Sequence, residues 1–274
     1  MLSVILPANN EAPLIGRCLQ GVLASGGPAQ CEVVVVANGC SDDTAEIARS
    51  YQEKFAARGW DLRVLDLEEG GKIGALNAGD AAAKGNMRVY LDADVEVGPK
   101  LLEKLANALS RKEATYASGR LVIARARSRV SRAYGRAYRE VPFIREGVPG
   151  AGVFAVNEEG RKRWGLFPDI ISDDTFVRLQ FAPQERLLVD ASYEWPIVEG
   201  WKNLVKVRRR QNQGVAEIRA NYPELLVNDD TRPLGLGGAL SLAIRAPFAF
   251  AVYVAVALTV KLTATEKDGW SRGR

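Results

Sequence analysis

The chain has 274 residues, of which 47% are hydrophobic and 26% charged, and its formal net charge is +4. This composition excludes a disordered protein, and the basic excess is too weak to indicate nucleic-acid binding by itself. Histidine is absent, so a metal site must use oxygen ligands, which favours Mg²⁺ or Mn²⁺ over zinc, and a general base must be a carboxylate, lysine, tyrosine or cysteine.

The first hundred residues alternate in hydrophobic period. Strands are expected at 2–6, 33–37, 62–67 and 87–91, and helices at 14–23, 44–55 and 73–83. This order predicts a parallel sheet with helices on both faces. Ligands of such sheets bind beyond the carboxyl ends of the strands, where the polar segments 7–11, 38–43 and 92–94 lie.

The second half of the chain is less regular. Strands are expected at 114–124, 150–156 and 187–190, and helices at 125–144, 172–181 and 200–220. Five arginines share one face of the first of these helices, at positions 125, 129, 132, 136 and 139. Two interpretations remain open: this face binds a counter-anion such as a lipid phosphate, or it is a solvated basic face paired with acids elsewhere.

Asp92-Ala93-Asp94 directly follows the fourth predicted strand. Two carboxylates at i and i+2 can both reach one divalent cation, and Mg²⁺ prefers carboxylates together with phosphate oxygens and water. A solvated turn is the alternative for this motif when it is taken alone.

Three more polar motifs stand in register with this pair. The segments are Pro7-Ala8-Asn9-Asn10-Glu11, Asn38-Gly39-Cys40-Ser41-Asp42-Asp43-Thr44 and Gly71-Lys72-Ile73-Gly74-Ala75-Leu76-Asn77. In order and spacing, the four motifs resemble those of the family-2 glycosyltransferases, from residue 2 to about residue 182. The resemblance implies a GT-A-type α/β fold with a mixed, mainly parallel central sheet flanked by helices. It also implies metal-dependent, inverting transfer from a nucleotide-diphospho-sugar.

The resemblance assigns the nucleotide-sugar-binding positions to Pro7, Asn9, Glu11, Asn38, Lys72, Asn77, Asp92 and Asp94. The first three belong to the loop that cups the nucleoside, and Asn38 stands where the family usually has an aspartate on the base. Lys72 and Asn77 lie near the ribose and diphosphate, and Asp92 and Asp94 hold the ribose and the Mg²⁺ or Mn²⁺ ion. Independently, a lysine at a helix start suits a diphosphate. Glu11 as a first-turn helix charge and 41–43 as a simple helix cap remain alternatives.

The acceptor side is assigned in the same way. Gly150 and Gly152 look like the family's glycine-containing acceptor strand, and Ser172-Asp173-Asp174-Thr175 matches its acidic pair. The resemblance makes Asp174 the catalytic base, and Asp173 is assigned to supporting the acceptor site. Adjacent carboxylates raise each other's proton affinity, which suits a base near neutral pH. A helix N-cap doublet is the alternative.

A motif of processive relatives is degraded here. Those enzymes carry Gln-x-x-Arg-Trp, whereas this chain has Val207 in place of the glutamine and Arg210-Gln211 in place of Arg-Trp. The difference argues against a processive polymer synthase. The arginines at 208–210 either reach the diphosphate or form a solvated basic helix.

The apolar segment 234–260 is long enough to span a bilayer, although Arg245 and Pro247 divide it. A membrane-seated helix is expected, with a core helix as the alternative. We therefore expect a catalytic domain at 1–232, with a nucleotide-sugar half at 1–97 and an acceptor half at 98–232, followed by a membrane-associating helix and tail at 233–274. The expected location is the cytoplasmic face of a membrane, peripheral or held by a single span.

The expected function is non-processive, inverting transfer from a UDP- or GDP-sugar to a hydroxyl of a glycan or lipid-linked acceptor, in cell-surface polysaccharide or glycolipid synthesis. An anionic membrane surface is a further expected partner, and nucleic acid is not. A catalytically silent nucleotide-sugar-binding protein is the main alternative. A sugar-phosphate nucleotidyltransferase would need a Gly-rich phosphate loop with Arg and Lys after the first strand, and 7–11 is unlike one.

Overall fold

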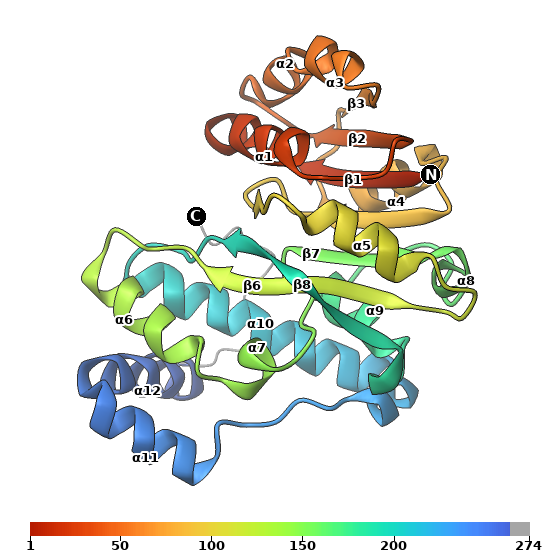
Figure 1. The fold of residues 1–274 in the computed structure, drawn as a ribbon. Helices are drawn as coiled ribbons and strands as arrows, with labels where there is room; N and C mark the ends of the chain where they lie inside the picture. The colour runs from red at the N-terminus through yellow and green to blue at the C-terminus, as the bar shows by residue number, and fades with distance from the viewer. Residues whose placement is uncertain (264–274) are drawn as a thin grey trace.

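The computed structural model describes residues 1–263, in which eight strands form one mixed sheet in the order β3-β2-β1-β4-β7-β6-β8-β5 (Figure 1). The pairs β3–β2, β2–β1, β1–β4 and β6–β8 are parallel. Strand β7 runs antiparallel to both β4 and β6, and β5 runs antiparallel to β8. The expected α/β class, with a mixed, mainly parallel sheet flanked by helices, is confirmed.

The N-terminal half of the sheet is parallel and covered on both faces. Its strands are β1 (Leu2–Ala8), β2 (Cys31–Asn38), β3 (Asp61–Leu67) and β4 (Met87–Leu91). Every residue of β1 and β2 is buried, because strands with helices on both faces have no solvent side. The carboxyl ends of β1, β2 and β4 therefore lie side by side at one edge, as the sequence predicts.

Helices α1 (Ala12–Ala24) and α4 (Lys72–Ala82) cover opposite faces of this half. Val4 of β1 belongs to the same apolar cluster as Ile15 of α1, whereas Ile5 packs with Leu76 of α4. The predicted helix at 44–55 is two short helices, α2 (Thr44–Arg49) and α3 (Gln52–Ala57). The sequence analysis did not predict the short strand β5 (Glu96–Val97) or the helix α5 (Leu101–Leu109).

The C-terminal half is built around an antiparallel insertion. Its strands are β6 (Tyr116–Ile123), β7 (Val153–Asn157) and β8 (Arg186–Trp195). Its helical segments are α6 (Arg129–Tyr138), α7 (Pro142–Arg145), α8 (Glu158–Arg161), α9 (Asp173–Leu179), η1 (Pro183–Glu185), α10 (Trp201–Asn221) and η2 (Pro223–Asn228). Strand β7 joins the halves by pairing with both β4 and β6.

The single basic helix predicted at 125–144 is wrong at both ends. Helix α6 begins after Ser128, whose hydroxyl accepts a hydrogen bond from the N–H of Ser131 at 3.0 Å, so Arg125 precedes the helix. Pro142 starts a new helix, α7, since proline is favoured in a first turn and cannot continue a helix. The other four predicted arginines of this face are exposed on α6 or at its C-cap.

The apolar segment at 234–260 is also two helices rather than one, α11 (Gly235–Arg245) and α12 (Pro247–Leu262). The break falls at Ala246, because a residue before proline is disfavoured in helical conformation. Helix α12 packs against α6 and α10. Within residues 1–263, no helix combines the length and apolar character needed to cross a membrane. The rest of the expected tail, 264–274, lies outside the described residues.

Candidate active site

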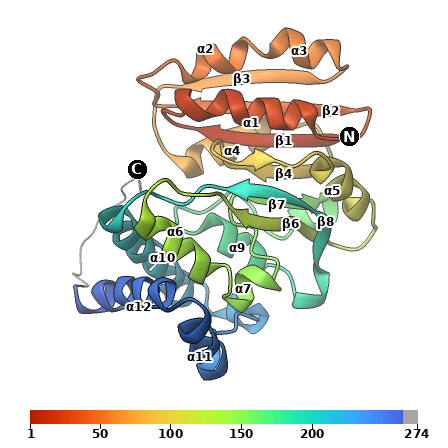
Figure 2. The ribbon, with the colours of Figure 1, turned by 60° about the vertical axis from the view of Figure 1, so that its left-hand side comes forward.

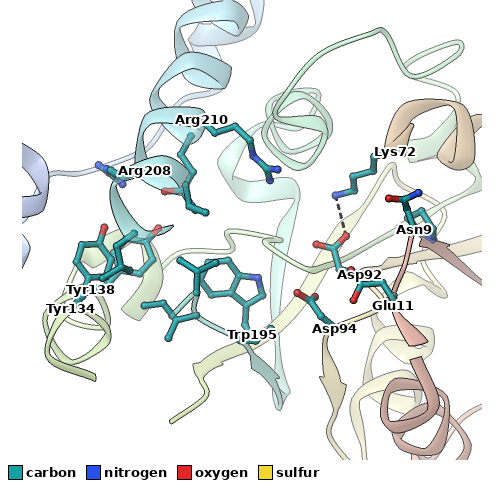
Figure 3. Close-up of a pocket in the computed structure, with 18 of the residues that line it drawn as sticks. Asn9, Glu11, Lys72, Asp92, Asp94, Tyr134, Tyr138, Trp195, Arg208 and Arg210 are labelled. Atoms are coloured by element: carbon teal, nitrogen blue, oxygen red, sulfur yellow. Dashed lines mark ion pairs between the residues drawn. The ribbon is translucent and has the colours of Figure 1, made fainter. Parts of the chain in front are cut away.

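A cavity of about 230 Å³ opens at the carboxyl edge of the parallel strands. The loops after β1, β2 and β4 form one wall, and the opposite wall comes from α6, α10 and the segment after β8. Figure 3 shows this division: Lys72, Asn9 and Glu11 lie on one side, and Tyr134, Tyr138 and Trp195 lie on the other. The structure thus places most of the predicted donor residues in one cavity, namely Pro7, Asn9, Glu11, Asn38, Lys72, Asp92 and Asp94.

Lys72 is the central cation of this cavity. It is the first residue of α4, and its Nζ lies 3.0 Å from Oδ1 of Asp92 and 3.1 Å from Oδ1 of Asp173. Burial disfavours the charged amine, but the carboxylates of Asp173 and Asp92 outweigh it and raise the pKa of Lys72. Lys72 therefore stays an ammonium and links the donor motif to the acidic pair, which are 81 positions apart in the sequence.

Asp92 and Asp94 both line the cavity, and the buried Ala93 lies between them. The turn is held by the N–H of Asp92, which donates to the carbonyl of Gly152 at 2.9 Å, and by the carbonyl of Asp92, which accepts from Val95 at 3.2 Å. Two carboxylates beside a space for phosphate oxygens fit Mg²⁺ or Mn²⁺. Residues 1–263 contain no group of three or more His, Cys, Asp or Glu side chains placed to hold a metal, so other oxygens would have to complete the coordination.

Asn38 is fully hydrogen-bonded inside the protein. Its amide donates to the carbonyls of Ala8 at 2.8 Å and Val36 at 3.2 Å, and its side-chain oxygen accepts from the N–H of Gly71 at 2.9 Å. It therefore ties the ends of β1 and β2 to the start of α4, although it also lines the cavity. Asn9 donates to the carbonyls of Asn38 and Gly39, so the two loops form one hydrogen-bonded unit.

Asn77 does not line the cavity with the other predicted donor residues. Its amide donates to the carbonyl of Phe167 at 3.1 Å, and its oxygen accepts from the N–H of Phe167 at 2.7 Å. Asn77 lies five residues after Lys72 on α4, and at 3.6 residues per turn its side chain points away from that of Lys72. In this structure Asn77 anchors the segment before α9 to α4.

The two aspartates of the acidic pair have different surroundings. Asp173 is buried and paired with Lys72; burial raises its pKa to about 6, Lys72 opposes this shift and Asp174 adds to it. Asp174 is half-buried in a narrow space beside the cavity that it shares with Asp92. Its Oδ1 accepts a hydrogen bond from the N–H of Thr175 at 2.6 Å, and within residues 1–263 its Oδ2 forms none.

Gly150 and Gly152 line the same narrow space, and both have positive φ angles, +69° and +77°. A Cβ at Gly150 would overlap the hydroxyl of Tyr116, and a Cβ at Gly152 would lie 2.8 Å from Cδ1 of Trp195. Only glycine adopts this backbone without strain. Gly152 therefore lets the segment pass close to the indole that lines the cavity, and Gly150 lets it pass close to Tyr116.

The sequence reading missed the aromatic wall of the cavity. Tyr134 and Tyr138 are one helical turn apart on α6, on the side opposite its arginines, and their rings stack at 5.8 Å. The spacing of these tyrosines is visible in the sequence, but it does not show which surface they face. The other apolar residues on this wall of the cavity are Trp195, Pro196, Ile197, Val198, Leu204 and Val207.

Two arginines of α10 also line the cavity. Arg210 extends between the two walls, whereas Arg208 lies beside the tyrosines (Figure 3). Neither guanidinium forms a hydrogen bond or an ion pair with any part of the chain that the structure describes. Val207 and Gln211, which replace the motif residues of processive relatives, line the same space.

The fold is of the GT-A type found in glycosyltransferases. The profile described as "Glycosyl transferase family 2" matches residues 3–152, more than half of the chain, and the chain belongs to this family.

Curated relatives match less than half of the chain. The chain is 34% identical over 111 residues to glycosyltransferase AglE of Haloferax volcanii, 30% over 115 residues to dodecaprenyl-phosphate galacturonate synthase of Rhizobium johnstonii, and 39% over 101 residues to dolichyl-phosphate beta-glucosyltransferase of Drosophila melanogaster. These matches cover 40%, 41% and 34% of this chain, and 35%, 33% and 30% of the relatives. The matched segment thus spans about a third of each relative's length.

Solved structures support the fold over a larger share of the chain. A mannosyltransferase of Pyrobaculum calidifontis in complex with GDP-Man and Mn²⁺ superposes with a TM-score of 0.61 at 22% identity, covering 96% of this chain and 76% of that one. Glucosyl-3-phosphoglycerate synthase of Mycobacterium tuberculosis, in complex with Mn²⁺, UDP and glucosyl-3-phosphoglycerate, gives a TM-score of 0.53 at 20% identity, covering 80% and 79%.

Proposed function

We propose that the chain is an inverting, non-processive transferase that moves one sugar from a nucleotide-diphospho-sugar to an acceptor hydroxyl. The observation that carries this proposal is the position of Lys72, 3.0 Å from Asp92 and 3.1 Å from Asp173. One ammonium joins the donor carboxylates to the acidic pair, so a diphosphate beside Lys72 would lie within reach of a base at Asp174.

On the donor side, Lys72 and the N-terminus of α4 favour a diphosphate. Asp94, together with Asp92, would hold Mg²⁺ or Mn²⁺, and a bound ion neutralises charge on the leaving diphosphate. Two structural neighbours contain Mn²⁺, one with GDP-Man and one with UDP. They support a UDP- or GDP-sugar as donor. Arg210 is a second cation for the diphosphate, from the opposite wall.

On the acceptor side, Asp174 takes the proton. The hydroxyl oxygen attacks the anomeric carbon, its proton passes to Oδ2 of Asp174, and the bond from the sugar to the diphosphate breaks with inversion. The carboxylate of Asp173 is paired with Lys72, so Asp173 is less suited to take the proton. Oδ2 of Asp174 has no hydrogen-bond partner within residues 1–263, so it can accept the acceptor's hydroxyl.

The aromatic wall and Arg208 support an acceptor with an apolar part and a nearby negative charge, as in a lipid-linked sugar or lipid phosphate. Tyrosine and tryptophan also suit sugar rings, so a glycan is the other acceptor class. Two relatives bear polyprenyl-phosphate names, which supports the lipid-linked class. The setting proposed is cell-surface polysaccharide or glycolipid synthesis. Val207 and Gln211 at the degraded motif support a non-processive enzyme.

A thermal-shift panel of UDP, GDP, dTDP and CMP derivatives, each with and without Mn²⁺, tests the donor assignment. We expect one nucleoside diphosphate to raise Tm, and Mn²⁺ to increase the effect, because a ligand of the folded state stabilises it. Sugar transfer from the matching donor then separates an enzyme from a silent nucleotide-sugar-binding protein. If no nucleotide shifts Tm, the assignment of the donor site is wrong. If one nucleotide shifts Tm but no acceptor is glycosylated, the chain is a catalytically silent nucleotide-sugar-binding protein.

A further inference from the structure

The outer face of α11 is apolar. Leu236, Leu240 and Ile244 recur at four-residue spacing on α11, and Phe248 continues the series at the start of α12; their side chains are 92%, 65%, 73% and 60% exposed. We call these four residues the apolar stripe. A surface helix normally turns such a stripe toward the protein core. Here the inner face of α11 buries Leu242 instead.

The position of α11 explains why the stripe has no cover. This helix packs chiefly against α12, and both views place it at the end of the molecule away from α2 and α3 (Figures 1 and 2). Two further large apolar side chains, Leu258 and Leu262 of α12, are 51% and 81% exposed. An exposed apolar helix face of this kind marks an interaction site.

The segment that carries the stripe contributes charge of one sign. The segment 231–263 contains no aspartate or glutamate, and its charged residues are Arg232, Arg245 and Lys261, all exposed. Arg245 approaches Glu140 at 3.8 Å, just after the C-cap of α6, so the end of α11 lies beside the end of the basic helix. An apolar strip bordered by cations complements an anionic lipid surface.

We propose that the apolar stripe is a docking surface for an anionic lipid bilayer. Leu236, Leu240, Ile244 and Phe248 enter the boundary between headgroups and acyl chains, and Arg232, Arg245 and Lys261 meet lipid phosphates. A second copy of the chain is a poorer occupant, because pairing two such faces would bring like charges together without an acid from 231–263. This inference rests on the surface itself and does not depend on the proposed activity.

The docked surface would lie behind the aromatic wall of the cavity. Helix α12 packs against α6, and Tyr253 of α12 lies 5.5 Å, between ring centroids, from Tyr134, which lines the cavity. The stripe and the aromatic wall are therefore connected through the packing of α12 on α6.

The test is co-sedimentation of the full chain with vesicles of phosphatidylcholine, with and without phosphatidylglycerol. We expect binding to the anionic vesicles, weakened by salt. The double variant Leu236→Ser/Ile244→Ser should bind at least about a hundredfold more weakly, because each buried leucine or isoleucine contributes on the order of 1.5–3 kcal/mol. The matched control is Leu166→Ser/Val227→Ser, which removes two side chains that are 76% and 84% exposed elsewhere; it should bind as the unaltered chain does.

A charge variant separates the two parts of the surface. Arg232→Gln/Arg245→Gln/Lys261→Gln should lose up to about a hundredfold in affinity for anionic vesicles, at about 1 kcal/mol per basic residue, with little change on neutral ones. Unaltered Tm values will show that each variant is folded. The proposal is overturned if the chain binds neither kind of vesicle, or if the variant Leu236→Ser/Ile244→Ser and the control variant bind vesicles equally. It is also overturned if Leu236→Ser/Ile244→Ser instead converts a dimer in solution to a monomer.

Discussion

The parallel half of the sheet and the helices of the C-terminal half line opposite walls of one cavity with side chains of different chemistry. The donor wall consists of polar loops at strand ends, whose side chains are tied together by hydrogen bonds such as those of Asn38 and Asn9. The opposite wall is aromatic and aliphatic, with two arginines that have no partner within residues 1–263.

Under the proposed function, this difference separates binding of the donor from choice of the acceptor. A pre-organised set of polar groups suits the nucleotide and diphosphate, which nucleotide-sugar donors share. The opposite wall is built from α6, α10 and the segment after β8, which lie outside the parallel half of the sheet. Variants on the donor wall should therefore change donor and metal affinity, whereas variants on the acceptor side should change turnover or acceptor use.

The largest expected effect is on the donor wall. Asp94→Ala should abolish transfer and remove the Mn²⁺-dependent part of donor affinity, because it deletes one of two carboxylates available to the ion. Donor titrations with Mn²⁺ and with EDTA measure this. Asp43→Ala, at an exposed aspartate after β2, is the matched control and should behave as the unaltered chain. Unchanged metal dependence of the Asp94 variant would refute the metal assignment.

The next largest effect tests the base. Asp174→Asn should lower kcat by about 10²–10⁴-fold and leave nucleotide affinity nearly unchanged, because a base acts on the acceptor in the transition state. Steady-state kinetics and nucleotide titration measure the two quantities separately. Asp173→Asn should reduce kcat less. A larger loss in the Asp173 variant would exchange the roles of the two residues, and no loss in either would contradict inverting transfer at this site.

A smaller effect tests Lys72, which links Asp92 to the acidic pair. Lys72→Met should weaken donor binding about 10–100-fold, since a hydrogen bond to a charged group contributes about 1.5–3 kcal/mol. Removing the ammonium also takes away the charge that lowers the pKa of Asp173, so that carboxyl should titrate at higher pH in the variant. Lys72→Arg keeps the charge and should recover part of the affinity. Donor affinity that is equal in both variants and the unaltered chain would exclude Lys72 from the diphosphate site.

The smallest expected effect concerns Gly152, just before β7. Gly152→Ala should destabilise the fold by about 1–3 kcal/mol and lower Tm by several degrees, because φ of +77° strains an alanine and its Cβ would meet Trp195. Gly165→Ala is the matched control, since a Cβ there meets nothing within 4 Å. Thermal unfolding measures both, and equal Tm values would show that the segment adapts.

The site was only partly predictable. Pro7, Asn9, Glu11, Lys72, Asp92 and Asp94 follow strand ends or open a helix, and strand ends of a parallel sheet meet at one edge, so their convergence follows from chain order. Asn77 is different, because its role depends on Phe167, a residue 90 positions away. Arg208 and Arg210 were visible as charges, but nothing local shows which face of α10 borders the cavity.

The sequence by itself determined the parallel half, because its strands are continuous apolar runs and their period, length and turn residues are local properties. It also located the acidic residues proposed for metal binding and catalysis in a chain without histidine. Tertiary structure decided which of two adjacent aspartates is paired with Lys72, and that α11 turns its large apolar side chains outward. Each of these depends on contacts between residues far apart in the chain, and periodicity carries no information about such partners.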